Sequence, residues 1–307
     1  MYPREIPITD LKVTHYMTIN PNAVNSNVNL PGAVAIMIIK SIGNLIVKQH
    51  QRPIGILTER EVIEYLANEK EIPNKLLSDM VLQPFFSVHP NTTVLHAATM
   101  MIQKKGRILV FDRDAEEKED KDTGNEKNYN QYNNKHNNDT IIDKQQDIYK
   151  EKKNKNEKLV GIITASDMVR AFSKTTINPS LESIMTRRIF DVDFDSHLIN
   201  AIDIMYKERI GSVIVNKDEK PYGIFTERDL LTKILSKEVR LDERVGDYCP
   251  NELITAEIGE MGMTAGEAAE TMHIAKIKRL PLRKDHKIVG IVTARDLVEL
   301  YQSQSHN

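Results

Sequence analysis

Apolar residues recur at helical spacing in four separate segments of the chain, and each segment is followed by an apolar run typical of a strand. The predicted helices contain the sequences AVAIMIIKS, VLHAATMMIQKK, LINAIDIMYKER and AGEAAETMHIAKI. The strands that follow them are predicted at residues 42–47, 106–111, 210–215 and 278–283. A charged turn, a second strand and a further helix, such as ERDLLTKIL, complete each segment. The chain is therefore predicted to repeat one unit four times, in the order helix, strand, strand, helix.

One short phrase closes every unit. It reads GILTERE at 55–61, GIITASD at 161–167, GIFTERD at 223–229 and GIVTARD at 290–296, so its glycines are 106, 62 and 67 residues apart. A further short strand is predicted ahead of the helix, as in FFSVH at 85–89 and ELITA at 252–256. The long first interval indicates a unit of about sixty residues that contains an insertion.

The insertion is predicted at residues 114–158, which are rich in Asn, Lys, Glu and Asp and nearly free of apolar residues. Such a composition buries too little surface to offset the entropy of ordering. We expect a disordered or weakly helical loop between a strand that ends near Phe111 and one that begins at Leu159. A docking arm or modification site stays an alternative to a tolerated hairpin insertion.

Composition limits the classes of function. The chain has 307 residues, 40% hydrophobic and 28% charged, with a net charge of -2, which suits two globular halves and gives no electrostatic case for nucleic acid or an anionic membrane. The N-terminus lacks the layout of a signal peptide, and the longest apolar run, residues 33–39, is too short to span a membrane, so a cytoplasmic protein is expected. Cys249 has no cysteine partner, and neither a metal-binding pattern nor a nucleophile–base set occurs in the sequence, so no metal site and no enzyme is predicted.

The four closing phrases, in register with IGSVIV, LESIMT at 181–186 and LLSDMV at 77–82, resemble the CBS domain, named for cystathionine β-synthase. The resemblance implies an α/β fold of the α+β type, in which each repeat is a small mixed sheet with two helices. It implies CBS motifs at 9–70, 78–175, 180–240 and 245–303, paired into two Bateman modules that assemble head to head into a disc. Whether the chain then forms a homodimer is left open.

The Thr-x-x-acid part of the phrase has two interpretations. Thr followed three residues later by Glu or Asp is a capping box for the next helix. The amides and positive end of that helix also make an anion site, so a phosphate could lie beside Thr226 and Arg228. Because Asp is shorter than Glu, we expect the Asp copies to cap poorly and to accept hydrogen bonds from a ribose, whereas Glu61 acts as a cap. In the resembled family this Asp binds the ribose and the Thr contacts ribose or phosphate.

These considerations nominate a set of ligand-binding residues in the last three units. They are Thr226, Arg228 and Asp229, expected first; Thr293, Arg295 and Asp296; and Thr164, Ser166 and Asp167. Lys278 and Arg279 replace the Gly-Ser of IGSVIV and are expected either to obstruct the cleft of unit 4 or to bind a polyphosphate. The resemblance places the base near the first strand of a unit, at Phe190, Asp191, Val192, Leu253, Ile254, Thr255, Ser87 and Val88.

The resulting hypothesis is a non-catalytic regulator that binds an adenosyl ligand, such as AMP, ADP or ATP, and transmits its occupancy to a separate protein partner. No cofactor is required. One alternative is a structural scaffold whose Thr-x-x-Asp phrases are caps alone, and another is a regulator of transcription that acts through a separate DNA-binding partner. The sequence does not identify the ligand or the partner.

Overall fold

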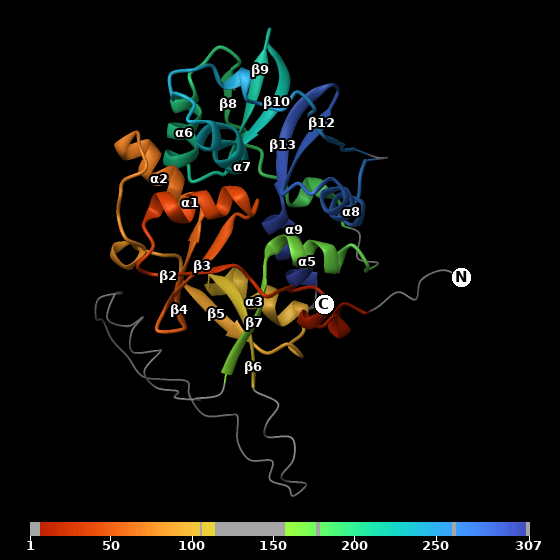
Figure 1. Ribbon diagram of the computed structural model, residues 1–307. Coiled ribbons are helices and arrows are strands. Elements are labelled where there is room, and N and C mark those ends of the chain that lie inside the picture. Colours follow the sequence, from red (N-terminus) through yellow and green to blue (C-terminus); the bar gives the residue numbers. More distant parts are fainter. Residues whose placement is uncertain (1–6, 105, 114–156, 176–178, 260–261, 305–307) are drawn as a thin grey trace, which may run out of the picture.

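The computed structural model describes residues 7–104, 106–113, 157–175, 179–259 and 262–304, and these form four small mixed sheets with their helices (Figure 1). Unit 1 consists of β2 (Ala23–Asn25), α1 (Leu30–Ile39), β3 (Asn44–Gln49), β4 (Arg52–Thr58) and α2 (Glu59–Glu69). Unit 2 consists of β5 (Phe85–Val88), α3 (Val94–Lys104), β6 (Arg107–Arg113), β7 (Glu157–Ile163) and α5 (Ala165–Phe172). Unit 3 consists of β8 (Asp191–Asp193), α6 (Leu198–Lys207), β9 (Ser212–Lys217), β10 (Lys220–Thr226) and α7 (Glu227–Asp229). Unit 4 consists of β11 (Ala256–Glu257), α8 (Ala265–Ala275), β12 (Arg279–Lys284), β13 (Lys287–Thr293) and α9 (Ala294–Gln304).

The four sheets share one topology. In each, the first strand runs parallel to the second and the second runs antiparallel to the third. The pairs Asn44↔Thr58, Ser212↔Thr226 and Arg279↔Thr293 hold equivalent positions in the hairpins of units 1, 3 and 4. The predicted fold class and the order of elements are confirmed.

Three local predictions are wrong. The strand expected at 252–256 is limited to β11, since residues 252–255 form no strand. The helix expected over ERDLLTKIL is one turn of α-helix followed by a π-helix (η6, Leu230–Ile234) and a 3₁₀ turn (η7, Leu235–Lys237). Here Thr232 and Ser236 donate hydrogen bonds to carbonyls four residues earlier, a contact that bends helices. The predicted insertion is two residues too long, because Glu157 and Lys158 belong to β7, and its remainder lies outside the described residues.

Units 1 and 2 pack against each other, and so do units 3 and 4. In each pair, the segment that precedes the first strand of one unit crosses the last strand of the other. The contacts include β1 (Thr18–Ile19) on β7 and the bridges Ile56↔Gln83 and Thr186↔Ile291. The glycine of each closing phrase lies beneath this crossing. A Cβ at Gly55 would lie 2.5 Å from the Leu82 Cβ, and one at Gly223 would lie 2.0 Å from the Pro250 carbonyl oxygen. The repeated glycine therefore permits the close approach that joins unit 1 to unit 2 and unit 3 to unit 4, as the predicted two modules require.

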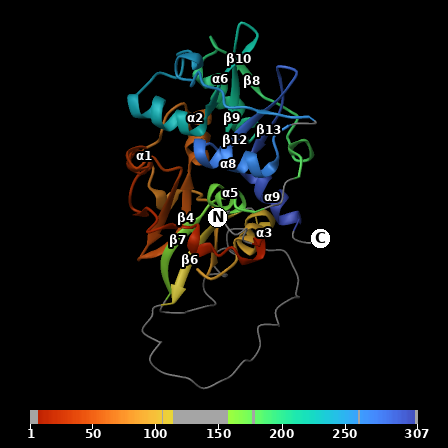
Figure 2. The same ribbon diagram turned by 90° about the vertical axis from the view of Figure 1, so that its right-hand side faces the viewer.

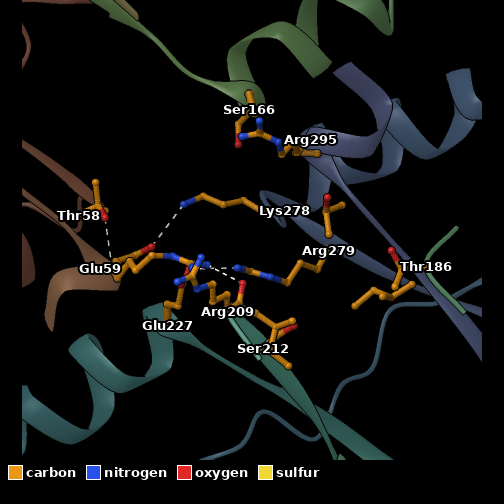
Figure 3. Close-up of a pocket in the computed structure, with 18 of the residues that line it drawn as sticks. Thr58, Glu59, Ser166, Thr186, Arg209, Ser212, Glu227, Lys278, Arg279 and Arg295 are labelled. Atoms are coloured by element: carbon orange, nitrogen blue, oxygen red, sulfur yellow. Dashed lines mark hydrogen bonds and ion pairs between the residues drawn. The ribbon is translucent and has the colours of Figure 1, made fainter. Parts of the chain in front are cut away.

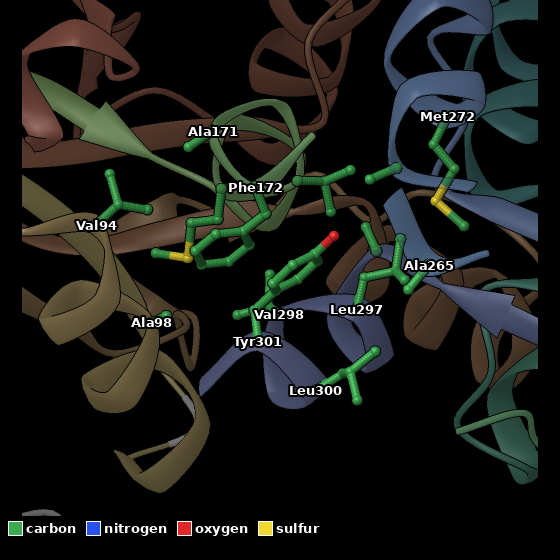
Figure 4. Packing of buried hydrophobic residues seen from close by; sticks show 14 of the residues in the cluster. Val94, Ala98, Ala171, Phe172, Ala265, Met272, Leu297, Val298, Leu300 and Tyr301 are labelled. Atoms are coloured by element: carbon green, nitrogen blue, oxygen red, sulfur yellow. The ribbon is translucent and has the colours of Figure 1, made fainter. Parts of the chain in front are cut away.

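The helices join the two modules. One buried cluster combines apolar residues of units 1 and 3, and a second combines those of units 2 and 4. In the second cluster, Phe172 of α5 stacks on Tyr301 of α9 with ring centroids 4.5 Å apart (Figure 4). The four units consequently surround a common centre, which Figures 1 and 2 show from two directions. Within the described residues, no helix is long and apolar enough to cross a membrane.

Candidate functional site

All four closing phrases form capping boxes at the start of a helix. In unit 3 the Thr226 N–H and hydroxyl donate to Asp229 Oδ2 at 3.0 and 2.6 Å, while the Asp229 N–H donates back to the Thr226 hydroxyl at 3.3 Å. Thr164 with Asp167 and Thr293 with Asp296 repeat these contacts. The expectation that Asp is too short to reach back is therefore wrong: the hairpin end holds the Thr amide close enough for either acid.

The second carboxylate oxygen distinguishes the four copies. Glu61 Oε1 accepts from the Gln83 amide at 2.5 Å, and Asp229 Oδ1 pairs with Lys233 at 3.0 Å. Asp167 Oδ1 lies 3.8 Å from Arg170. For Asp296 Oδ1, the described part of the chain supplies neither a hydrogen bond nor an ion pair. Unit 4 thus has the acid with the most free bonding capacity.

Burial affects these acids unequally. It raises the pKa of Asp167 above its ordinary value, against the opposing effect of the hydrogen bonds from Thr164 and the charge of Arg170. Asp229 is also buried, with 8% of its surface exposed. Asp167 and Asp296 are half-buried, so all three nominated Asp residues are capped and at least partly shielded from solvent.

A cavity of about 410 Å³ lies where the four units meet, and every unit contributes to its wall. Seven cationic side chains line it: Arg60, Arg107, Arg188, Arg209, Lys278, Arg279 and Arg295. Two carboxylates, those of Glu59 and Glu227, accompany them. Hydroxyl groups come from Thr58, Thr164, Ser166, Thr186, Ser212 and Thr293. The wall therefore has a net formal charge of +5 beside hydroxyl donors, a combination suited to a polyanion.

The cations are held in different ways (Figure 3). Lys278 lies 3.6 Å from Glu59, and Arg279 donates to Glu227 at 3.0 Å. Arg107 donates from Nε to Asn44 at 3.2 Å, and its burial lowers its pKa. Within the described residues, the side chains of Arg209 and Arg295 have no hydrogen-bonded or ionic partner.

Units 1 and 3 exchange a reciprocal pair of hydrogen bonds at the edge of the cavity. Arg60 donates to the carbonyl of Arg209 at 2.8 Å, and Arg228 donates to the carbonyl of Ser41 at 2.5 Å. Arg60 and Arg228 are equivalent in the repeat, and so are the two acceptors, which share a left-handed backbone with φ of 54° and 53°. This exchange binds the two modules together.

Of the residues put forward from the sequence, those that line the cavity are Thr164, Ser166, Phe190, Lys278, Arg279, Thr293 and Arg295. Thr226, Arg228, Asp229, Asp167 and Asp296 do not line it. Asp191 and Val192 lie on β8, where Asp191 accepts from Asn216 at 2.6 Å, while Ile254 and Thr255 lie in the irregular segment before β11. Phe190 lines the cavity, but Asp191 and Val192 do not.

Sequence reasoning missed the Arg residues at positions 60, 107, 188 and 209. Arg60 holds the same position in TERE as the nominated Arg228 holds in TERD, so a comparison of the two phrases could have identified it. Arg107 is the first residue of β6 in unit 2, as Arg279 is of β12 in unit 4, so the two could have been aligned. Arg188 and Arg209 carry no motif, and the fold alone brings them to the centre.

The chain was compared with known proteins. It matches the CBS domain at residues 13–68, 77–117, 181–236 and 246–303. Over 36% of its length it is 40% identical to an uncharacterized protein of Methanopyrus kandleri, and over 48% it is 28% identical to an uncharacterized protein of Methanocaldococcus jannaschii. Each alignment spans 58% of the length of the relative.

Two solved structures share the fold over nearly the entire chain. One is the crystal structure of the same Methanocaldococcus jannaschii protein, a proposed archaeal homologue of γ-AMPK, with a TM-score of 0.68, 16% identity, and coverage of 95% of this chain and 100% of that one. The other, an uncharacterized conserved protein of Pyrococcus horikoshii, has a TM-score of 0.54, 20% identity, and coverage of 94% and 99%. Together with the four sequence matches, the repeated sheets and the paired units, these findings show that the chain belongs to the CBS domain family.

Proposed function

We propose that the chain is a non-catalytic regulatory protein that binds an adenine nucleotide, with the phosphates in the central cavity and the nucleoside in the cleft between units 3 and 4. The observation that carries this proposal is the composition of the cavity wall, with seven cations against two carboxylates. A phosphate chain supplies the missing negative charge and accepts hydrogen bonds from both guanidinium and hydroxyl groups.

The cavity also has an apolar part on the side of units 3 and 4. Ile189, Phe190, Ile210, Ile214 and Ile291 line it, beside Thr186 and Arg188. A flat base fits between such side chains, and one aromatic ring favours stacking. A ligand with a base at one end and phosphates at the other matches both parts of the wall.

Asp296 is our candidate for the ribose. Asp296 does not itself line the cavity, but it follows Arg295, which does, and its Oδ1 has no partner among the described residues. A carboxylate oxygen in this position accepts from a ribose hydroxyl while the other oxygen retains the cap. Asp229 and Asp167 stay secondary candidates, because Lys233 and Arg170 already compete for their second oxygens.

Regulation follows from the position of the cavity. All four units contribute to its wall, so a ligand that prefers one arrangement of the two modules shifts the equilibrium toward that arrangement. A separate protein partner would bind the two arrangements with different affinity and so respond to the shift. The proposed motifs are 9–70, 78–175, 180–240 and 245–303.

A structural scaffold without a ligand is the second candidate. The capping boxes support it, because hydrogen bonds within the chain account for Thr and acid in all four phrases. It does not explain the excess of cations at the centre, which repel one another when no anion is present.

Thermal unfolding with AMP, ADP, ATP and S-adenosylmethionine separates the two candidates. A ligand at one hundred times its Kd adds about 2.7 kcal/mol, which raises Tm by roughly 4 °C for a protein of 307 residues. Calorimetric titration then compares Asp296→Asn with Glu61→Gln, a matched change in a phrase whose acid has both oxygens occupied.

We expect Asp296→Asn to weaken binding by about tenfold or more, because a hydrogen bond to a charged group is lost, and Glu61→Gln to leave Kd within about twofold. An unchanged Tm with every ligand would reject the proposal in favour of the scaffold. Equal losses in both variants would reject the role of Asp296.

A further inference from the structure

Glu59 and Glu227 occupy the same place in units 1 and 3. Each follows the Thr of the closing phrase, and each N–H donates to the carbonyl of a glycine, Gly43 or Gly211. A Cβ at Gly43 would lie 2.8 Å from the Glu59 carboxylate, and one at Gly211 would lie 1.6 Å from Arg279 Nη2 and 2.6 Å from Glu227 Oε2, so a larger residue at either position would displace these side chains. The repeat thus places a carboxylate at the same position of the cavity wall in both modules.

Units 2 and 4 lack this acid. Ala165 and Ala294 replace it, and both line the cavity. Unit 4 instead supplies cations, because Lys278 and Arg279 stand where unit 3 has Gly211 and Ser212. The repeat therefore alternates between units that present an acid and units that do not.

Both carboxylates are directed to the cations of unit 4. Glu227 pairs with Arg279 at 3.0 Å, and their side chains are 13% and 18% exposed. Glu59 reaches across the cavity from the other module to Lys278 at 3.6 Å, with 8% of its side chain exposed (Figure 3). Among the described lining cations, Lys278 and Arg279 alone have an ionic partner on the wall, because the acid next to Arg188, Glu208, lies outside the cavity.

We propose that Glu59 and Glu227 are internal counter-ions that occupy the phosphate-binding groups of Lys278 and Arg279 and must be displaced by a bound ligand. This inference rests on the proposed function of the cavity. In the absence of ligand the two acids reduce repulsion among the seven cations of the wall, of which Arg107, Arg279 and Arg295 are half-buried and the other four are exposed. When phosphate enters, the same acids repel it, so they set the affinity of the site and determine which ligands bind.

The proposed counter-ions select for ligands that carry more charge. A monophosphate gains little from cations that are already neutralised, whereas a di- or triphosphate carries enough negative charge to replace the carboxylates at Lys278 and Arg279. Removal of an acid should therefore increase affinity, and the increase should grow from AMP to ADP to ATP. If Glu59 and Glu227 served only in structural ion pairs, their removal would not increase the affinity for ATP.

Calorimetric titration of Glu227→Gln and Glu59→Gln with AMP, ADP and ATP tests the inference. Gln keeps the size of the side chain and can still donate or accept a hydrogen bond, and the two positions lie in different units, so one variant remains informative if the other does not fold. We expect about tenfold tighter ATP binding in each, the effect of removing one like charge some 10 Å or less from the phosphates at an effective dielectric constant of about 20. Glu257→Gln, which removes an acid from an exposed pair with Arg283, serves as the control and should leave Kd unchanged.

A double-mutant cycle shows whether the acid acts through its partner. In an Arg279→Gln background, Glu227→Gln should give a smaller gain than in the natural chain, because no cation remains for the acid to occupy. Unchanged or weaker ATP binding by both single variants, while the natural chain binds ATP, would overturn the inference and leave the proposed function intact. If the natural chain and both variants bind none of the three nucleotides, the proposed function itself fails and the counter-ion inference falls with it.

Discussion

The two inter-module interfaces use the same position of the repeat in different ways. Between units 1 and 3, Arg60 and Arg228 each donate to a carbonyl of the opposite unit. Between units 2 and 4, the equivalent residues are Ser166 and Arg295, which lie beside one another on the cavity wall (Figure 3). Paired guanidinium groups close one interface, whereas the guanidinium of the other has no hydrogen-bonded or ionic partner in the part of the chain that the structure describes.

This difference shows how four copies of one unit acquire different roles. The arginine two residues after the Thr of the closing phrase makes a structural hydrogen bond when the opposite unit offers a carbonyl, and it is a candidate phosphate ligand when the opposite unit offers a small hydroxyl. The second interface compensates by packing: Phe172 and Tyr301 stack there, and neither side chain has measurable exposure. Hydrogen bonds thus hold one side and aromatic packing holds the other.

The largest expected effect comes from the aromatic stack. Phe172→Ala should lower the free energy of unfolding by about 3 to 5 kcal/mol, because it opens a cavity between the two modules. Chemical denaturation measures this loss. Phe172→Leu, which keeps most of the volume, should cost about 1 kcal/mol. If both variants cost the same, packing does not hold this interface.

A smaller effect is expected from the reciprocal arginines. Both side chains are partly solvated, so each hydrogen bond is worth about 1 kcal/mol, and Arg60→Gln with Arg228→Gln should together cost about 2 kcal/mol. Arg295→Gln is the matched control and should cost nothing, because Arg295 has no partner among the described residues. A loss of stability in Arg295→Gln equal to that of the double variant would remove the distinction between the interfaces.

Much of the fold could be predicted because it is repeated. Hydrophobic periodicity located α1, α3, α6 and α8, and the closing phrases located the last strand and helix of every unit. The first strand of unit 4 was misplaced because β11 has two residues, too few to show a pattern. The apolar spacing after Asp229 predicted a regular α-helix, because nothing in that spacing distinguishes it from the π-helix that forms there.

The site was less accessible to sequence reasoning. Arg228 and Arg295 occupy identical places in TERD and TARD, and the motif of unit 3, which contains Arg228, was expected first because it also has Gly211 and Ser212. What separates them is the opposite unit, which contacts Arg228 at Ser41, whereas the described residues offer Arg295 neither a hydrogen bond nor an ion pair. The length of the acid side chain was a poor criterion, since Glu61 and the three Asp residues all complete their caps.

The smallest expected effect concerns two caps on the second interface. Burial raises the pKa of Asp167 above its ordinary value of 3.8, so its proton is bound more tightly in the folded state; the stability that this provides is full below 3.8 and is lost as pH rises through the folded pKa. Exposed Glu267 behaves oppositely: hydrogen bonds from the Thr264 amide and hydroxyl lower its pKa below 4.5, and its contribution is lost as pH falls through the folded pKa. NMR titration of the side-chain carboxyl carbons should show the two midpoints displaced in opposite directions. Displacement of both in one direction would contradict the difference in burial.

The central claim is that the free guanidinium of unit 4 binds phosphate while its counterpart in unit 3 holds the modules together. Calorimetric titration of ATP into Arg295→Gln and Arg228→Gln tests it most directly, since the two variants make the same change at equivalent positions. The account predicts that Arg295→Gln raises Kd by about 10- to 100-fold, the value of a charge-assisted hydrogen bond, and that Arg228→Gln changes Kd by less than about twofold. A larger loss of affinity in Arg228→Gln than in Arg295→Gln would contradict it.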